Sequence, residues 1–245
     1  MQRYFIPQPF EDGMLVISGD DAKHIQKVMR MQVGQTILVV SENHAYEAII
    51  DGFVGQDVRV KKSSEALRSN ELPKKVTICC GLPKGEKLDL ITQKATELGM
   101  FELLLFEAER SIVKWDVQKG KKKQERLQKI AKEAAEQSHR NVVPAIREVM
   151  TFKQLLQLTK QYDLLFVADE EDAKQVERTQ LAEHLKNAYD KHSICIVFGP
   201  EGGLSRYEIQ ALKENGFQPI ALGPRILRAE TAPLYALSAI SYEFE

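Results

Sequence analysis

Cysteine is scarce in this chain, and its positions do not fit a disulfide framework or a metal site. Only three of the 245 residues are cysteines, and Cys79, Cys80 and Cys195 all lie inside apolar runs without C-x-x-C spacing. This pattern is typical of buried thiols in a reducing compartment. The histidines show no ligand-like spacing with one another or with cysteine, so we expect no metal.

Long apolar runs are also missing. No uncharged stretch approaches the roughly 18 residues that a membrane-spanning helix needs. The first ten residues contain Arg3 and two prolines, which does not fit the apolar core of a secretion signal. We therefore expect a cytoplasmic protein with no membrane partner. A composition of 43% hydrophobic and 28% charged residues is ordinary for one large globular domain or two modest ones.

The chain as a whole has almost no net charge. Its 34 basic and 35 acidic side chains leave a charge of −1, so the total does not indicate nucleic acid. Basic residues are nevertheless concentrated between Arg110 and Lys132, with nine of them and, counting Glu133, three acidic residues. The segment is either a solvated surface helix or a patch that follows an RNA backbone. The local excess of positive charge and the neighbouring Trp115 favour the patch.

Three common glycine motifs are absent. The sequence contains no G-x-x-x-x-G-K-[ST], no G-x-G-x-x-G and no G-x-S-x-G. Glycines do follow two apolar runs, in the segments Gly199 to Ser205 and Gly223 to Ala232. Glu201 would repel a phosphate in the first segment. We expect instead a small ligand, neutral or cationic where it meets Glu201, held mostly by backbone groups of the two loops.

Local patterns place the first of these loops between a strand and a helix. Ser193 to Phe198 is uncharged and rich in β-branched residues, as expected of a strand buried in a parallel sheet. Ser205 and Glu208 have the spacing of a capping box, which predicts that a helix begins at Arg206. Ordinary turns could account for either loop alone, but turns do not need the four charges of Glu201, Arg225, Arg228 and Glu230.

The first 62 residues are predicted to form a small antiparallel barrel. Short alternating segments are separated by turn residues, and only Asp20 to Met31 has helical spacing. Asp20 or Asp21 is the expected cap of this helix. One helix face carries the apolar side chains Ala22, Ile25, Val28 and Met29. The predicted strands are Arg3 to Ile6, Met14 to Ile17, Gln35 to Val40, Tyr46 to Ile50 and Val58 to Lys61.

A polar linker over Ser63 to Pro73 separates this barrel from a second pattern. Beyond it, buried strands alternate with amphipathic helices, which include Lys121 to Ser138 and Lys174 to Tyr189. Such alternation predicts an α/β domain with a mostly parallel sheet. We therefore expect two domains, at residues 1–70 and 74–245.

The two glycine loops carry a family resemblance. Gly199-Pro200-Glu201-Gly202-Gly203, followed by Leu222-Gly223-Pro224-Arg225-Ile226-Leu227-Arg228-Ala229-Glu230-Thr231-Ala232, resembles the signature of the SPOUT methyltransferases, and within them the RsmE group. The resemblance implies a knotted C-terminal α/β domain, a PUA-like N-terminal barrel, S-adenosylmethionine as cofactor and a homodimer. It also implies methylation of N3 of a uridine in the 16S rRNA of the small ribosomal subunit.

The resemblance assigns roles to the charged loop residues. Uridine N3 keeps its proton at neutral pH, so the site needs a base or a group that stabilises the anion. Arg228, with Arg225 as a second candidate, is the expected anion stabiliser, and Glu201 either orients the cofactor or accepts the proton. Alternatively, Arg228 forms an ion pair with Glu230 or Glu201 that only fixes the loop. The expected cofactor-binding residues are Gly199, Glu201, Gly202, Leu222, Gly223, Arg225 and Leu227.

RNA contacts are expected from both parts of the chain. His24 to Arg30, followed by Gly34, is similar to the RNA-binding motif of the PUA-like barrel. Glu133 to Arg140 is similar to the helix end that borders the active site in the RsmE group, although its last residues could simply end the helix. The expected RNA-binding residues are Arg3, His24, Arg30, Arg110, Lys114, Lys121, Lys122, Arg126, Gln137 and Arg140.

Two other functions fit these observations less well. The chain could be a non-catalytic RNA-binding protein on the same scaffold, in which case it would bind no cofactor. It could also methylate another RNA, for example a ribose oxygen of tRNA. N3 lies on the Watson–Crick edge of uracil, so the expected reaction requires an unpaired or flipped-out base.

Overall fold

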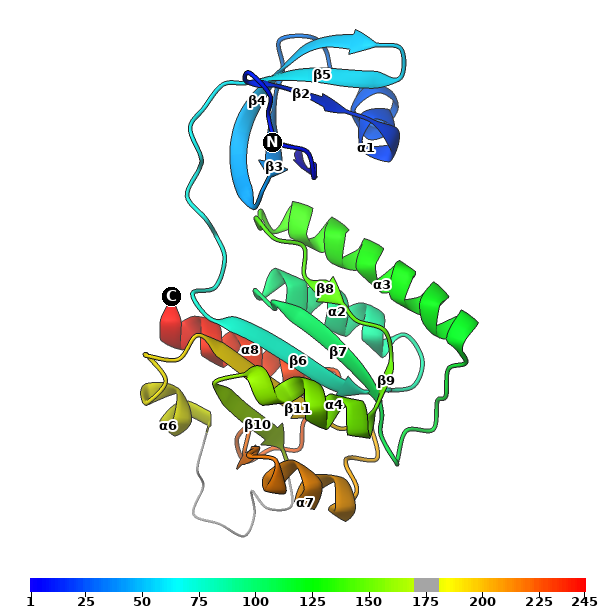
Figure 1. Ribbon diagram of the computed structural model, residues 1–245, viewed down its shortest axis with the longest axis vertical. Helices are drawn as coiled ribbons and strands as arrows, with labels where there is room; N and C mark the ends of the chain where they lie inside the picture. Colours follow the sequence, from blue (N-terminus) through cyan, green and yellow to red (C-terminus); the bar gives the residue numbers. More distant parts are fainter. Residues whose placement is uncertain (170–180) are drawn as a thin grey trace. The chain divides into compact units, whose positions relative to one another are not determined.

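The computed structural model describes residues 1–169 and 181–245, which form two compact units (Figure 1). The first unit contains Met1–Glu71 together with Ala135–Val142, and the second contains Leu72–Ala134 and Val143–Glu245. A segment from the middle of the chain thus belongs to the N-terminal unit. Within the described residues, no helix is long and apolar enough to cross a membrane.

All five strands predicted for the first unit are present. They form one sheet in the order β1-β3-β4-β5-β2. The strands are β1 (Arg3–Phe5), β2 (Met14–Ile17), β3 (Thr36–Ser41), β4 (His44–Val54) and β5 (Asp57–Lys62). The prediction of an antiparallel barrel is wrong for one strand pair, because β1 runs parallel to β3. Alternating apolar residues on these strands bury one face in a core that includes Ile17, Ile37 and Ile50.

The single helical segment of this unit differs from the prediction. It consists of α1 (Gly19–Lys23), whose N-cap position is Ser18 and not Asp20 or Asp21, followed by a π-helical turn over His24–Val28. In that turn the Met29 N–H donates to the His24 carbonyl, one residue farther back than in an α-helix. The extra residue rotates the following side chains. Ala22 and Ile25 are therefore buried, whereas Val28 and Met29 are exposed.

The second unit contains a parallel sheet in the order β12-β10-β11-β6-β7-β8, and β9 also pairs with β7. Every strand pair in it is parallel, as the buried apolar runs predict. The strands are β6 (Lys75–Gly81), β7 (Glu102–Glu107), β8 (Ala145–Ile146), β9 (Met150–Thr151), β10 (Leu164–Ala168), β11 (Ser193–Phe198) and β12 (Gln218–Ile220). Because all of them run the same way, their carboxyl ends lie at one edge of the sheet.

Helices cover both faces of this sheet (Figure 1). One face packs against α2 (Lys87–Glu97), α3 (Val117–Gln137), α6 (Leu181–Lys186) and α8 (Thr231–Phe244). The other packs against α4 (Phe152–Leu158) and α7 (Arg206–Glu214). The helix predicted over Lys174 to Tyr189 is described only as α6, and its residues 174–180 lie outside the described residues.

Two helix starts show how local side chains set the boundaries. The capping box predicted for α7 is present, with Ser205 Oγ accepting from the Glu208 N–H and the Glu208 carboxylate accepting from the Ser205 N–H. Helix α3 begins earlier than predicted, at Val117. The Asp116 carboxylate accepts from the Lys119 N–H there at 2.8 Å, which satisfies one of the open donors of the first turn.

The cysteines are buried free thiols, as predicted. Cys79 on β6 and Cys195 on β11 lie on the same face of the sheet, with their sulfur atoms 3.3 Å apart. Burial raises the pKa of the Cys79 thiol well above its usual value and that of Cys80 to about 12. These thiols therefore stay protonated and act as small apolar core residues.

Candidate active site

The first glycine loop, Gly199–Ser205, follows β11 and folds tightly back on itself. A Cβ atom on Gly199 would lie 2.7 Å from the Gly203 carbonyl carbon and 2.8 Å from the Leu204 nitrogen, so only glycine fits. The Gly203 N–H donates to the Pro200 carbonyl at 2.8 Å, and Gly203 has a φ of +68°. This turn exposes Glu201 and Gly202 at the carboxyl edge of the sheet, where open α/β sheets bind ligands.

The second loop, Leu222–Glu230, follows β12 and leads into α8. Gly223 has a φ of +94°, a conformation that disfavours any side chain. Leu222, Gly223 and Leu227 are half-buried, whereas Arg225 and Arg228 are exposed. The Arg228 carbonyl accepts from the first two N–H groups of α8. The loop therefore presents a partly covered backbone with cationic side chains beside it.

Lys87, which the sequence did not single out, joins the two loops. Its Nζ lies 2.9 Å from Glu201 Oε1 in the first loop and 3.1 Å from Glu230 Oε2 in the second. The Lys84 N–H also donates to Glu201, at 3.0 Å. Lys84, just before α2, and Lys87, at its start, thus connect both glycine loops to the same edge of the sheet.

These contacts bear on the two roles considered for Glu201. Burial raises the pKa of Glu201, but the hydrogen bonds from Lys87 and from backbone N–H groups outweigh it, and the net pKa lies below its usual value. A carboxylate held in its charged form is a poor proton acceptor at neutral pH. The geometry therefore favours an orienting role for Glu201 over that of a general base.

Arg228 is not held by its neighbours. Its side chain is 84% exposed, and its guanidinium reaches Glu230 only at 4.0 Å, the limit of an ion pair. An exposed pair of this length contributes little to stability. The loop-fixing alternative for Arg228 is thus poorly supported, because Lys87 already holds Glu230 at shorter distance.

The loop after β7 borders the first glycine loop. Arg110, expected to contact RNA, donates from Nη1 to the Gly202 carbonyl at 3.0 Å, and its backbone lies against Gly202. Next to it, Ser111 is buried, and its hydroxyl has no hydrogen-bond partner among the described residues. Sequence reasoning missed Ser111, because a lone serine after a strand carries no recognisable signal.

The basic segment lies on an exposed helix face, as predicted. In α3, Leu127, Ala131, Ala134 and Ala135 are buried. Four of the expected RNA-binding residues here are exposed, namely Lys114, Lys121, Lys122 and Arg126. Arg126 is partly neutralised, because it forms an ion pair with Asp89 on α2. Among the described residues, no group of three histidine, cysteine, aspartate or glutamate side chains is placed to share a metal ion.

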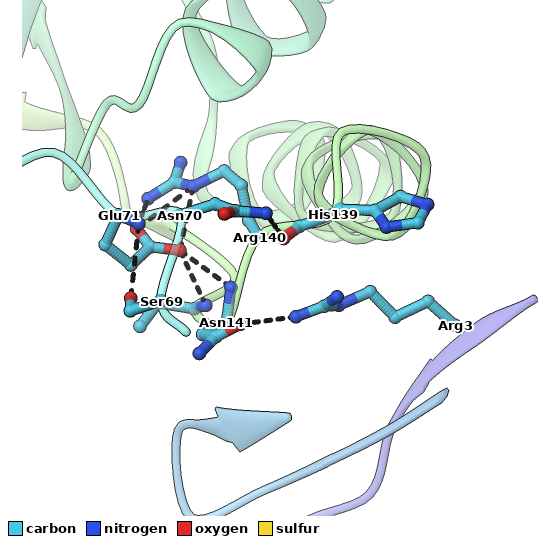
Figure 2. Close-up of polar contacts among 8 residues, drawn as sticks. Arg3, Ser69, Asn70, Glu71, His139, Arg140 and Asn141 are labelled. Carbon is cyan, nitrogen blue, oxygen red and sulfur yellow. Dashed lines mark hydrogen bonds and ion pairs between the residues drawn. The ribbon is translucent and has the colours of Figure 1, made fainter. Parts of the chain in front are cut away.

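In the first unit, two of the expected RNA-binding residues lie inside a polar cluster, the Glu71 cluster, made of Arg3, Glu71, Arg140 and Asn141 (Figure 2). Only 5% of Arg3 and 3% of the Arg140 side chain are exposed. The guanidinium of Arg140 pairs with the Glu71 carboxylate, and Arg3 donates to the side-chain carbonyl of Asn141. Both arginines therefore face protein acceptors and not solvent, so a contact with RNA would require them to exchange these partners.

Glu71 accepts hydrogen bonds from the backbone as well as from Arg140. The backbone N–H groups of Asn141 and Val142 donate to its Oε1 at 2.7 and 3.1 Å. Asn70 donates to the carbonyl of His139, which has a φ of +58°. The last predicted linker residues thus fix the loop that ends α3, a contact between segments about 70 positions apart in sequence.

The remaining expected contacts of this unit lie nearer to solvent. The His24 ring is half-buried and its Nδ1 lies 3.0 Å from the Tyr4 hydroxyl. Arg30 is exposed, with a φ of +51°, and Gln137 is exposed in the last turn of α3. Of the expected RNA-binding residues on this unit, these three are therefore at least partly accessible to solvent.

Comparisons with known proteins agree with this arrangement. The sequence profile of an RNA methyltransferase domain matches residues 70–241, and that of an RNA methyltransferase PUA domain matches residues 17–52. Ribosomal RNA small subunit methyltransferase E of Bacillus subtilis is 47% identical over 258 residues, covering 100% of this chain and 98% of the relative.

Solved structures give the same result. The ribosomal RNA small subunit methyltransferase E of Neisseria gonorrhoeae, bound to S-adenosyl methionine, superposes with a TM-score of 0.84 at 26% identity and covers 99% of this chain and 97% of its own. A putative methyltransferase of Legionella pneumophila, in complex with the cofactor SAM, has a TM-score of 0.83 at 28% identity, with coverage of 98% and 96%. With a profile match over most of its length and a full-length relative at 47% identity, this chain belongs to the ribosomal RNA small subunit methyltransferase E family.

Proposed function

We propose that this protein methylates N3 of a specific uridine in the 16S rRNA of the small ribosomal subunit, with S-adenosylmethionine as methyl donor. The observation that carries this proposal is the pair of glycine loops at one edge of the parallel sheet, joined through Lys87, in a chain of this family. Backbone groups of Gly199, Gly202, Leu222, Gly223 and Leu227 would hold the cofactor. The side chain of Arg110 borders the first of these loops, and the next residue, Ser111, has a hydroxyl without a hydrogen-bond partner among the described residues.

The chemistry requires placement and charge stabilisation from the protein. When bound, S-adenosylmethionine supplies a methyl group activated by its sulfonium. Arg228 extends from the second loop and stabilises negative charge on the uracil carbonyls, which lowers the pKa of N3 and lets solvent take its proton. The N3 lone pair then forms the new C–N bond, and the electrons of the broken C–S bond stay on sulfur. Holding the two reactants in line can contribute about 7–11 kcal/mol.

We also propose that the protein forms a homodimer and that its C-terminal domain is knotted. Its domains would be residues 1–70 and 74–245, and the protein would be located in the cytoplasm. Support for the dimer comes from α8, whose exposed residues Thr231, Tyr235, Ser238 and Tyr242 form a stripe without charge. An uncharged stripe with two exposed tyrosines is typical of an interface. Support for the knot comes from the strand order, in which β12 returns past β11 to pair with β10.

Mapping the methylated nucleoside tests this function. We expect wild-type protein to convert uridine to 3-methyluridine in small subunits that lack the modification, with S-adenosylmethionine as the only added donor. Gly199→Ala should abolish both the product and cofactor binding in calorimetry, because the added Cβ meets backbone at 2.7 Å.

Gly120→Ala is the matched control, because a Cβ on Gly120 meets nothing within 4 Å. It should leave activity unchanged. Methylation of a tRNA ribose by the wild-type protein would assign another substrate, and the absence of any cofactor binding would favour the non-catalytic RNA-binding alternative.

The exposed lysines of α3 are expected to contact RNA phosphates. Lys121→Ala and Lys122→Ala should each reduce the slope of log affinity against log salt by about 0.7 to 0.9, the value for one released counterion. Measurements of RNA binding at several salt concentrations would show this. Lys153→Ala, an exposed lysine on α4 at the other face of the sheet, should leave the slope unchanged. Equal slopes for all three variants would mean that α3 is only a solvated helix.

A further inference from the structure

Lys87 occupies a position that local physical chemistry disfavours. It is the first residue of α2, where the partial positive charge of the helix N-terminus opposes a cation. The two local acids do not cap the helix at this position, because the N-cap residue Glu86 makes no side-chain capping hydrogen bond and Asp89 pairs with Arg126. A residue whose local electrostatics are unfavourable is often retained for an interaction with a distant part of the chain.

The contacts of Lys87 explain its placement. Its Nζ lies 2.9 Å from Glu201 and 3.1 Å from Glu230, so one ammonium pairs with one carboxylate from each glycine loop. The side chains of Lys87 and Glu201 are each 30% exposed, and that of Glu230 is 14% exposed. Partly covered ion pairs in a network are worth more than isolated surface pairs. Together the three side chains form a clasp, the Lys87 clasp, across the two loops.

We propose that Lys87 is a positioning residue for the methyl donor, which it serves by holding the two cofactor loops together through Glu201 and Glu230. This inference rests on the proposed function, because it concerns the same site. The two loops are separated in sequence by α7 and β12, and the ammonium of Lys87 pairs with one carboxylate in each of them. Without the clasp, the cofactor has to order two separate loops when it binds. The entropy lost in that ordering reduces the binding free energy and so weakens the affinity.

The clasp remains charged throughout the physiological range. The hydrogen bond to Glu201 raises the pKa of Lys87. For Glu201 and Glu230, burial raises the pKa, but the hydrogen bonds from Lys87 and backbone groups outweigh it and leave both below their usual values. Lys84 contributes a backbone N–H, and Arg228 is the other cation near Glu230. The clasp therefore acts as a fixed connection and not as a pH switch.

Calorimetry with S-adenosylmethionine tests the proposal on the full-length protein. Lys87→Met keeps the length of the side chain and removes its charge, and it should weaken cofactor affinity by about tenfold. Lys87→Arg should restore most of the loss, because it can pair with both carboxylates. Lys94→Met, on the same helix, breaks the partly exposed Lys94–Glu97 pair, which involves neither glycine loop, and should bind like wild type.

A double-mutant cycle separates positioning from direct contact with the cofactor. If Lys87 acts through the carboxylates, Lys87→Met in a Glu201→Gln background should cost clearly less than in wild type, so the two losses are not additive. Thermal melting should confirm that all variants fold. The KM for S-adenosylmethionine should rise in Lys87→Met, with the KM for the RNA substrate unchanged.

Several outcomes would overturn the inference. Wild-type affinity in Lys87→Met would show that the clasp does not hold the loops. Additive losses in the cycle would show that Lys87 contacts the cofactor itself. If the wild-type protein bound no S-adenosylmethionine, the proposed function would fail, which is distinguishable from the failure of the clasp alone.

Discussion

Arg228→Ala should lower the rate of methyl transfer by about 10²–10³-fold, the usual cost of removing one group that stabilises an anion in the transition state. Affinity for S-adenosylmethionine should stay within a few-fold of wild type. The reason is geometric: the Arg228 side chain is 84% exposed, and its pair with Glu230 spans 4.0 Å. The side chain therefore contributes little to the loop and remains available to the RNA base.

Single-turnover rates and calorimetry on the same variant measure the two quantities separately. Arg228→Lys should recover part of the rate, because it keeps the charge but loses the planar, bidentate geometry of arginine. Arg225→Ala tests the second candidate in the same loop and should have a smaller effect on rate. A collapse of both rate and cofactor affinity in Arg228→Ala would instead assign Arg228 a structural role in the loop.

Glu71→Gln should destabilise the first unit by about 3 kcal/mol, the lower end of the range for a buried charge that loses its partner. Glu71 pairs with Arg140, whose side chain is almost entirely buried. Its carboxylate also accepts from the N–H groups of Asn141 and Val142. The variant removes the negative charge that pairs with the buried guanidinium of Arg140 and weakens the hydrogen bonds that the two backbone N–H groups donate.

Hydrogen exchange gives a local measurement of this loss. The amides of Asn141 and Val142 should exchange about a hundredfold faster in Glu71→Gln, since 1.36 kcal/mol corresponds to a factor of ten. Arg59→Met removes an exposed ion pair with Asp51 in the same unit and should change stability by less than about 1 kcal/mol. Unchanged protection of the two amides in Glu71→Gln would mean that Glu71 does not hold the loop.

A compensating variant strengthens the test. Replacing both partners, Glu71→Leu with Arg140→Met, removes the buried charges together, and such exchanges are often neutral. Recovery of stability in this double variant would show that the loss in Glu71→Gln comes from the lost charge interaction between Glu71 and Arg140. Continued instability would assign the loss to the backbone hydrogen bonds that Glu71 accepts.

The features predicted correctly from sequence are those that neighbouring residues control. The apolar run Ser193–Phe198 specifies a buried strand whatever lies beside it. Ser205 and Glu208 complete their capping box within one turn of helix, so their spacing suffices to place the start of α7. The motif glycines were likewise recognisable, because the tight turn at Gly199 is a property of consecutive residues.

The sequence did not indicate the environment of residues whose partners are distant in sequence. Arg140 looks like a surface cation in sequence, and its burial follows from Glu71, which is 69 positions away. Arg3 depends in the same way on Asn141, which is 138 positions away. A charged side chain is buried only where a partner offsets the loss of hydration. No spacing rule predicts where the chain brings such a partner.

By itself, then, the sequence determined the strands, most helix boundaries, the two glycine loops and the family, since each depends on short-range patterns or on a long contiguous motif. Only the tertiary structure decided that the arginines of the Glu71 cluster are internal, that Val28 is exposed, and that Lys87 pairs with both loops. Electrostatic interactions act over a few ångströms in space regardless of separation along the chain. The charge environment of each site residue is therefore set by the fold and not by its neighbours in sequence.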